Sequence, residues 1–188
     1  MENTIRWETT MDRALTRART ERKPVIVDIF AHGCIGCKQM DEVTFTDRKV
    51  TDFINNNMIP VRLNSNTREA TDFKVKWTPT ILVLDRDGKP HHRVIGFTSP
   101  DEMIPTLLLG IAKTHFDNNE FNEATTCLNK VITEHPRCKV APEAIFIKGV
   151  SIYKNFNDPQ GLKECYQLLN ERYPDSEWTM RAYPYKLL

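Results

Sequence analysis

The feature that most constrains this chain is a short apolar run followed at once by two closely spaced cysteines. Residues 25–31 read VIVDIFA, and their β-branched side chains predict a buried strand. Asp28 is the one polar residue in that run. Cys34 and Cys37 follow, and the next residues have the pattern of a helix that runs toward Val43. This order places both sulfurs on one face at the start of a helix, close enough to bond to each other.

A Cys-x-x-Cys pair in this position suits redox chemistry. The free N–H groups and the positive dipole end of the helix favour the thiolate form of Cys34. A thiolate attacks a disulfide, and a second thiol within reach then resolves the mixed disulfide. The spacing of the two cysteines alone is also consistent with two ligands of a metal site, or with two thiols that have no joint function.

The alternatives to a redox pair need partners that the sequence does not place nearby. A zinc site needs four ligands, so His91, His92 and Cys138 would have to converge on the pair. A papain-like thiol enzyme needs a histidine and an asparagine or aspartate brought in by the fold, and a strand that leads into Cys-x-x-Cys argues against it. We expect no metal site, and we expect His91 and His92 on an exposed strand.

The remainder of the first hundred residues alternates between helical and extended patterns. Three helices are expected, and Thr46 is the predicted N-cap of the second. Asp87 and Gly88 predict the tight turn of a hairpin. The expected helices are 8–22, 46–57 and 66–75, the expected strand is 58–64, and the expected hairpin is 78–97.

From about residue 99 the pattern becomes entirely helical. Ser99 and Pro100 open a helix in which Pro105 predicts a kink. Two segments repeat at an offset of 38 residues, AxxxLxxVxxxxP from Ala124 and LxxxYxxLxxxxP from Leu162. Helix pairs at this period are typical of solenoid arrays. The region 104–182 resembles tetratricopeptide repeats in size, spacing and closing proline, and a plain antiparallel helical bundle is the alternative.

The first part of the chain resembles the thioredoxin family. VDIFAHGCIGCK is similar to that family's strand and active-site turn, and WTPT (77–80) to its cis-proline segment. More narrowly, the residues from KPVIVDIF to MIPVRLN resemble the branch that includes the C-terminal thioredoxin-like domain of the DsbD transmembrane reductase. The resemblance implies an α/β thioredoxin fold, with a central mixed sheet flanked by helices, over 1–110. An all-α extension of helical-hairpin repeats would then cover 111–188.

The same resemblance assigns roles to individual residues. Cys34 would be the exposed nucleophile and Cys37 the resolving thiol, the two forming the redox disulfide. Asp28 would be a buried carboxyl beneath Cys37, with a pKa raised by burial, that shuttles a proton. A strand-edge Asp28 that faces water is the alternative. The surface that binds the substrate would comprise Thr78, Pro79 with a cis peptide bond, Ile35 and Gly36.

The departures from the family pattern bear on the direction of electron flow. Gly33 stands where thioredoxins carry tryptophan, and Ile35-Gly36 where they carry Gly-Pro. A glycine in the first turn makes the helix start less stiff. No histidine lies between the cysteines, which favours a reductase over an oxidase. Lys38 adds positive charge near the thiolate, or is an ordinary exposed lysine.

Composition narrows the classes of partner and the compartment. The net charge of +1 comes from 26 basic and 25 acidic residues among 188, so neither nucleic acid nor an anionic membrane is expected as a partner. No apolar stretch approaches the ~18 residues of a membrane span. Five thinly spread cysteines do not make a disulfide framework and favour a reducing compartment. The N-terminus lacks the pattern of a signal peptide, so we expect a cytoplasmic protein, or a periplasmic one if a signal peptide was removed.

These observations lead to a thiol–disulfide oxidoreductase, a disulfide reductase in direction, that needs no cofactor. Its partner would be a protein disulfide substrate or a redox protein. The helical extension would recruit that partner or form a homodimer. The alternative is a non-catalytic adaptor that uses a thioredoxin fold and helical repeats for protein binding only, although an adaptor has no need of both cysteines.

Overall fold

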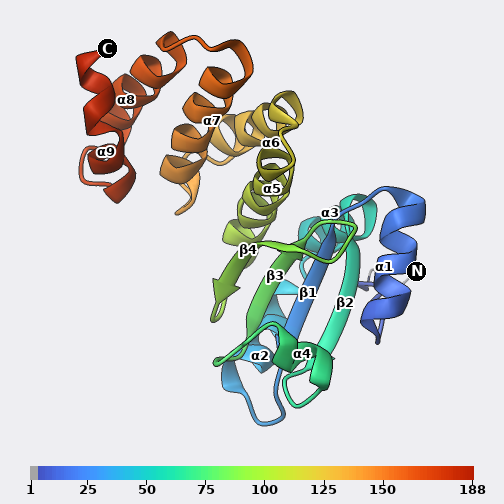
Figure 1. The fold of residues 1–188 in the computed structure, drawn as a ribbon. Coiled ribbons are helices and arrows are strands. Elements are labelled where there is room, and N and C mark those ends of the chain that lie inside the picture. The colour runs from blue at the N-terminus through green and yellow to red at the C-terminus, as the bar shows by residue number, and fades with distance from the viewer. Residues whose placement is uncertain (1–3) are drawn as a thin grey trace. The chain divides into compact units, whose positions relative to one another are not determined.

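The computed structural model describes residues 4–188, and its contacts divide the chain into two compact units. The first unit is Met1–Ile104 and the second is Pro105–Leu188. Helix α5 (Pro100–Asp117) begins in the first and continues in the second. Figure 1 shows the sheet in the blue-to-green first unit and helices alone in the yellow-to-red second unit. The boundary predicted after residue 110 falls within α5.

A four-stranded mixed sheet forms the centre of the first unit, as predicted. Its strands are β1 (Val25–Phe30), β2 (Ile59–Asn64), β3 (Thr80–Leu84) and β4 (Pro90–Ile95), in the spatial order β2-β1-β3-β4. β1 and β2 are parallel, so a crossover that contains helices joins them, whereas β3 is antiparallel to both of its neighbours. The interior strand β1 delivers the chain to the two cysteines at its carboxyl end.

The predicted helices flank this sheet, although several begin at other residues than expected. The first helix begins at Met11 because Glu8 instead pairs with Val61 at the edge of β2. The prediction of Thr46 as N-cap is wrong, because the Thr46 hydroxyl donates to the Glu42 carbonyl of the preceding turn and Asp47 caps α3 instead. The helices of this unit are α1 (Met11–Glu21), α2 (Ile35–Gln39), a π-helical turn (Met40–Thr44), α3 (Arg48–Asn57) and α4 (Arg68–Asp72).

The two faces of the sheet have different roles. One face packs in a core cluster with α1 and α4, and the side chains of alternate β1 residues enter it. The strand members of that cluster are Val25, Val27, Ile29, Ile59, Val61, Leu63, Leu82 and Leu84. Because side chains alternate along a strand, Asp28 and Arg62 point to the opposite face, where the helix that carries the cysteines lies. Burial on both faces explains why β1 is almost continuously apolar.

The second unit consists of helices in which α7 packs against both α6 and α8. Close approach of α7 and α8 requires glycine at two positions, since a Cβ on Gly149 would lie 2.5 Å from Cys165 Cβ and a Cβ on Gly161 would lie 2.7 Å from Ile152 Cγ2. The all-α extension is confirmed, and its likeness to tetratricopeptide repeats stays a prediction. Its helices after α5 are α6 (Phe121–Glu134), α7 (Ala141–Phe156), α8 (Gln160–Arg172), α9 (Glu177–Ala182) and a 3₁₀ segment (Tyr183–Leu187).

Candidate active site

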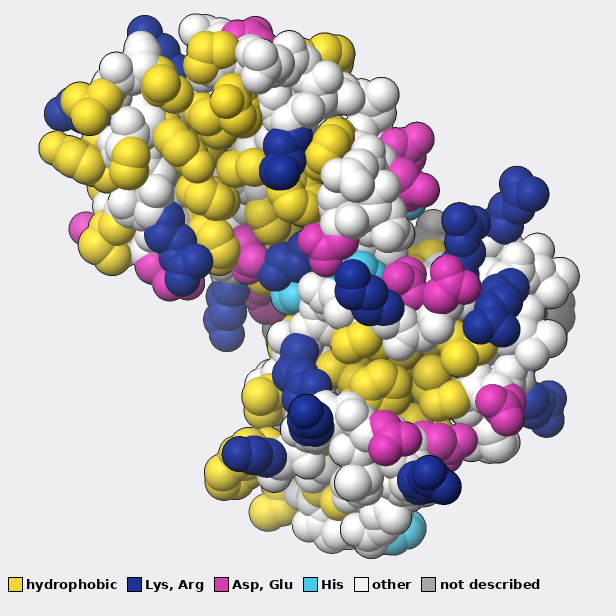
Figure 2. All heavy atoms as spheres, viewed as in Figure 1, with side chains coloured by type: hydrophobic (Ala, Val, Ile, Leu, Met, Phe, Trp, Pro, Cys, Tyr) yellow, Lys and Arg dark blue, Asp and Glu magenta, His cyan; other side chains and the backbone are white. Residues whose placement is uncertain are grey.

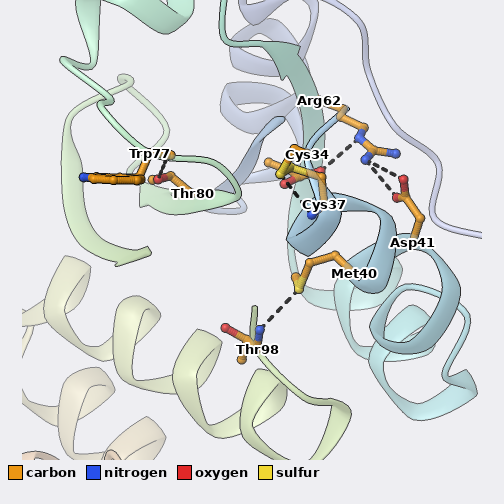
Figure 3. The surroundings of a disulfide bond; sticks show 9 residues. Cys34, Cys37, Met40, Asp41, Arg62, Trp77, Thr80 and Thr98 are labelled. Carbon is orange, nitrogen blue, oxygen red and sulfur yellow. Dashed lines mark hydrogen bonds and ion pairs between the residues drawn. A yellow bond between two sulfur atoms is a disulfide. The ribbon is translucent and has the colours of Figure 1, made fainter. Parts of the chain in front are cut away.

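Cys34 and Cys37 form a disulfide at the start of α2, with their Cα atoms 5.3 Å apart (Figure 3). Cys34 is the N-cap residue of the helix, and its sulfur accepts the Cys37 N–H at 3.1 Å. Cys34 is half-buried, whereas Cys37 is 4% exposed. The outer sulfur therefore meets both solvent and the free N–H groups of the first helical turn, and the inner sulfur is enclosed.

Two local features build the turn before the helix. Gly33 has φ of +76°, in the left-handed region, and no atom lies within 4 Å of where its Cβ would be. Glycine adopts this conformation at no steric cost, so it reverses the chain between β1 and α2. The Cys34 N–H donates to the Ala31 carbonyl at 3.3 Å across the turn. The absence of a large side chain at Gly33 leaves open space in front of Cys34.

Pro79 lies directly against the first turn of α2. The Thr78–Pro79 peptide bond is cis, as predicted. A Cβ added to Gly36 would lie 2.9 Å from Pro79 Cδ, so the position between the two cysteines has no room for a larger residue. The Pro79 carbonyl accepts the Gly96 N–H at 2.8 Å, which joins this loop to the end of β4. The structure thus brings the cysteine turn and the proline loop together.

Asp28 is buried, as predicted, with 1% of its surface exposed. Its Oδ2 atom lies 2.9 Å from Arg62 Nε, a contact that is an ion pair but not an aligned hydrogen bond. Within residues 4–188 its Oδ1 atom has no hydrogen-bond partner. Burial raises the pKa of Asp28 to about 7, the nearby Arg62 opposes the rise, and the neighbouring Asp41 adds to it. The alternative of a water-facing carboxylate is wrong.

Arg62 and Asp41 complete the charged cluster, and sequence reasoning missed both. Arg62 lies opposite Asp28 in the β1–β2 register, and its Nη2 atom is 2.8 Å from Asp41 Oδ1. Its guanidinium carbon lies 4.6 Å from the centre of the Phe30 ring and 5.9 Å from that of Trp7. Figure 3 shows Arg62 reaching from β2 toward the helix that carries Asp41. An arginine inside the apolar strand MIPVRLN was the available signal, since buried arginines need an acidic partner.

The helix that carries the cysteines is anchored at its far end. After α2 it widens into the π-helical turn, a distortion that is frequent at functional sites. The buried Met40 sulfur accepts the Thr98 N–H at 3.3 Å (Figure 3). The Thr44 hydroxyl donates to the Thr98 carbonyl at 2.6 Å. Both contacts tie the helix to the residues just before α5, which holds the cysteine turn in place.

An open pocket of about 330 Å³ lies beside the disulfide, bordered by Cys34, Ile35, Lys38, Asp41 and Arg62 among others. Ile35 is 78% exposed at its mouth. Lys38 lies 3.6 Å from Glu42 in an exposed ion pair, so its charge is partly neutralised by its own helix. The pocket gives a substrate access to the outer sulfur, whereas Asp28 is not part of its lining and is sealed from solvent.

A zinc site at the cysteine pair was the alternative that would need ligands from elsewhere in the chain. Within the described residues no three histidine, cysteine, aspartate or glutamate side chains cluster as a metal site would require. The prediction that His91 decorates an exposed strand is wrong, because its imidazole is fully enclosed with Nε2 at 2.9 Å from Asp85 Oδ2. That contact closes the β3–β4 hairpin. None of the helices described in residues 4–188 is long and apolar enough to cross a bilayer.

Comparisons with known proteins agree with this geometry. A sequence profile described as a thioredoxin-like domain matches residues 11–110. The thiol:disulfide interchange protein DsbD of Campylobacter jejuni strain RM1221 is 31% identical over 94 residues, and that of Yersinia pestis strain Pestoides F is 34% identical over 98. These alignments cover 47% and 48% of this chain but only 16% of each relative.

A solved structure also bears on the fold. It is the solution structure of a candidate disulphide-isomerase from Bacteroides thetaiotaomicron, which matches with a TM-score of 0.53 and 26% identity. The match covers 59% of this chain and 96% of that one. The similarity in sequence and in structure therefore falls on the first unit, which contains the cysteine pair.

Proposed function

This chain belongs to the family of thioredoxin-like domains, and from that premise we propose that it is a thiol–disulfide oxidoreductase that acts on protein disulfides. The observation that carries the proposal is the pair itself. Cys34 and Cys37 are close enough to bond, one accessible and one enclosed, at the start of a helix. A binding module needs none of these features.

In the reducing direction the exchange takes two steps. The Cys34 thiolate attacks one sulfur of a substrate disulfide, which forms a mixed disulfide and releases the other substrate sulfur as a thiolate that takes up a proton. Cys37 then loses its proton and attacks the Cys34 sulfur. The second substrate thiol leaves, and the protein is left with the Cys34–Cys37 disulfide. Two electrons pass from the protein to the substrate.

Asp28 is proposed to take the proton that Cys37 loses. A useful base has a pKa close to the working pH, and burial raises that of Asp28 to about 7. Its unpartnered Oδ1 leaves one oxygen available for that proton. We expect the rate of the second step to show an inflection near pH 7 that the Asp28→Asn variant lacks, measured by stopped-flow fluorescence on a preformed mixed disulfide. An unchanged inflection in the variant would remove Asp28 from this role.

The surface that receives the substrate is proposed to be Thr78, Pro79, Ile35 and Gly36. Within residues 4–188 nothing bonds to the N–H or the C=O of Thr78, and backbone groups left unpaired beside a site can pair with an extended peptide. Pro79 touches Gly36 between the cysteines, so a peptide paired with Thr78 passes close to Cys34. Ile35 offers apolar contact at the pocket mouth.

The direction of electron flow is proposed to be that of a reductase. Support comes from Gly36 and Ile35, the two residues between the cysteines, neither of which stabilises a thiolate as a histidine there would. The test is an equilibrium titration of the Cys34–Cys37 couple against glutathione, with the oxidised fraction read by thiol alkylation and mass spectrometry. A reductase gives a potential near −270 mV, and a value near −120 mV would instead indicate an oxidase; both are order-of-magnitude guides.

A role in recruiting a partner is proposed for the helical unit. Hydrophobic side chains gather on the visible face of α7 to α9 in Figure 2, and large exposed apolar patches mark protein-binding surfaces. The exposed large apolar side chains of this part of the chain are Tyr153, Phe156, Met180, Tyr183, Leu187 and Leu188. A homodimer through this surface is the other outcome, and sedimentation of the wild type against Phe156→Ala distinguishes a self-associating surface from one that binds another protein.

A non-catalytic adaptor remains the competing function, and trapping separates it from the enzyme. In Cys37→Ser the resolving thiol is missing, so a redox enzyme accumulates mixed disulfides between Cys34 and its substrates. An adaptor forms none. We also propose a reducing compartment such as the cytoplasm, because the five thinly spread cysteines do not make a disulfide framework; fractionation of cells that express the untagged protein tests this.

A further inference from the structure

Trp77 differs from Trp7 and Trp178 because, among the described residues, its ring packs against no other aromatic ring. Trp7 packs edge-on against Phe45, and Trp178 packs against Phe146. The side chain of Trp77 is 72% exposed, and within residues 4–188 its ring makes no aromatic or cation contact. An indole left in water gives up the large burial that usually makes tryptophan stabilising, so its exposure calls for an explanation outside the fold.

The exposure does not come from a loose loop. The Trp77 carbonyl accepts the hydroxyl of the buried Thr80 at 2.7 Å. Two residues further along, Pro79 is wedged against Gly36 and bonded to the end of β4. Figure 3 shows the indole held out from this anchored loop, to the side of the disulfide. The backbone therefore holds Trp77 in one place, in the loop whose Pro79 packs against the cysteine turn.

The position of Trp77 relative to Thr78 indicates what it meets. Thr78, the next residue, has the unpaired N–H and C=O that an extended peptide can pair with. Trp77 Cα lies at most about 7 Å from Pro79 Cα, the reach of one trans and one cis peptide. Since alternate side chains of an extended peptide point to one face, a peptide bound at Thr78 carries one of its side chains over the indole. That residue lies a few positions away from the cysteine at Cys34, because the indole points aside from the disulfide.

The charged residues near Trp77 in the sequence indicate which charges a bound peptide should carry. Lys74 and Lys76 are exposed, and neither forms an ion pair within the described residues. Two unpaired ammonium groups within three residues of an exposed tryptophan favour acidic residues in a bound peptide and disfavour basic ones. The loop thus carries one exposed aromatic side chain and two exposed cations.

We propose that Trp77, with Lys74 and Lys76, selects protein disulfides whose extended segment carries an aromatic or large apolar residue flanked by acidic residues, a few positions from the attacked cysteine. The inference rests on the proposed exchange reaction and names the substrate class of that same site. Trp77 would determine which substrates bind, whereas Cys34 and Cys37 would carry out the disulfide exchange.

The test uses the full chain and synthetic peptides that share one cysteine and one small leaving thiol. The peptides carry Phe or Ala at each of the first four positions on either side of the cysteine, with Glu or Lys as neighbours. Release of the small thiol gives kcat/KM for each. We expect the wild type to prefer Phe over Ala by about tenfold at one position, as one well-fitted apolar contact provides. The preference for Glu over Lys should fall as salt is added.

Variants separate the inference from a general loss of function. Trp77→Ala should bring the Phe-to-Ala ratio close to one, whereas Trp77→Phe should retain most of it. Val43→Ala shortens another exposed apolar side chain of the same unit, one that does not line the pocket beside the disulfide, and should leave the ratio unchanged. Circular dichroism checks that each variant is folded, which is expected because Trp77 is 72% exposed.

The failures of the two proposals differ. A wild type that reduces all the peptides equally well, or a Trp77→Ala variant that keeps the full preference, would overturn the assignment of Trp77 and leave the oxidoreductase standing. A wild type that reduces none of the peptides would overturn both.

Discussion

Replacing Asp28 by asparagine is expected to stabilise this protein at alkaline pH. Asp28 is enclosed within β1, and burial raises its pKa from an ordinary 3.8 to about 7 even though Arg62 opposes the rise. Holding that carboxylate ionised in the folded state therefore costs about 4 kcal/mol, at about 1.4 kcal/mol for each pH unit between the two values. Asparagine has nearly the same shape without the charge. Arg62 keeps its ion pair with Asp41 in the variant.

The effect has a definite sign with pH. The folded state binds the Asp28 proton more tightly than the unfolded state does, so this group's contribution to stability is full below about pH 4 and is lost as the pH rises toward 7. The wild type bears the whole cost above about pH 7, and the variant bears none. The gain in free energy of unfolding should thus grow from less than about 1 kcal/mol at pH 4 to about 4 kcal/mol at pH 8.

Urea unfolding of the oxidised proteins, followed by circular dichroism across that pH range, measures the gain directly. The slope of the unfolding free energy against urea concentration should be the same for both proteins, because unfolding exposes the same surface in each. Asp41→Asn is the matched control, because Asp41 pairs with the same arginine from a side chain that is 44% exposed. It should change stability by less than about 1 kcal/mol. A gain for Asp28→Asn that is the same at all pH values, or a loss at pH 8, would refute the reasoning.

Glycine-to-alanine variants test the packing at the site, with Gly36 as the test and Gly33 as its control, and the packing of the helical unit at Gly149. In Gly36→Ala the new methyl group meets Pro79, so the rate of insulin reduction should fall several-fold. In Gly33→Ala the new methyl group has open space, so the rate should hold and only about 1 kcal/mol of stability should be lost through the positive φ. Equal losses of activity in the two variants would contradict this. In Gly149→Ala the methyl group meets Cys165 Cβ, so thermal unfolding should show a loss of about 1–3 kcal/mol, and an unchanged midpoint would show that α7 and α8 part freely.

Much of the site could be predicted because its chemistry lies in one continuous stretch. Cys34, Cys37 and Asp28 fall within ten residues of one another, and the strand and helix patterns around them are strong. Pro79 lies far along the chain, and its placement depended on the resemblance to a known family. The structure brings it against Gly36 through β3, the strand that pairs antiparallel with β1.

Arg62 and His91 show what sequence patterns leave undetermined. Arg62 reaches Asp28 only because β1 and β2 pair in the register that sets the two residues opposite each other, and a shift of one residue would point it to the other face. His91 lies on an edge strand with an alternating pattern, which predicts exposure. Asp85 folds back across the hairpin turn to enclose it, a contact between two polar residues that hydrophobic periodicity does not report.

Reduction of insulin disulfides in the presence of dithiothreitol tests the central claim most directly. The claim is that Cys34 is the nucleophile of a redox pair with Cys37. Cys34→Ser should reduce the catalysed rate by on the order of 100-fold or more, whereas Cys127→Ser, which alters a thiol in the other unit, should keep the wild-type rate. Equal rates for the wild type and Cys34→Ser would contradict the account.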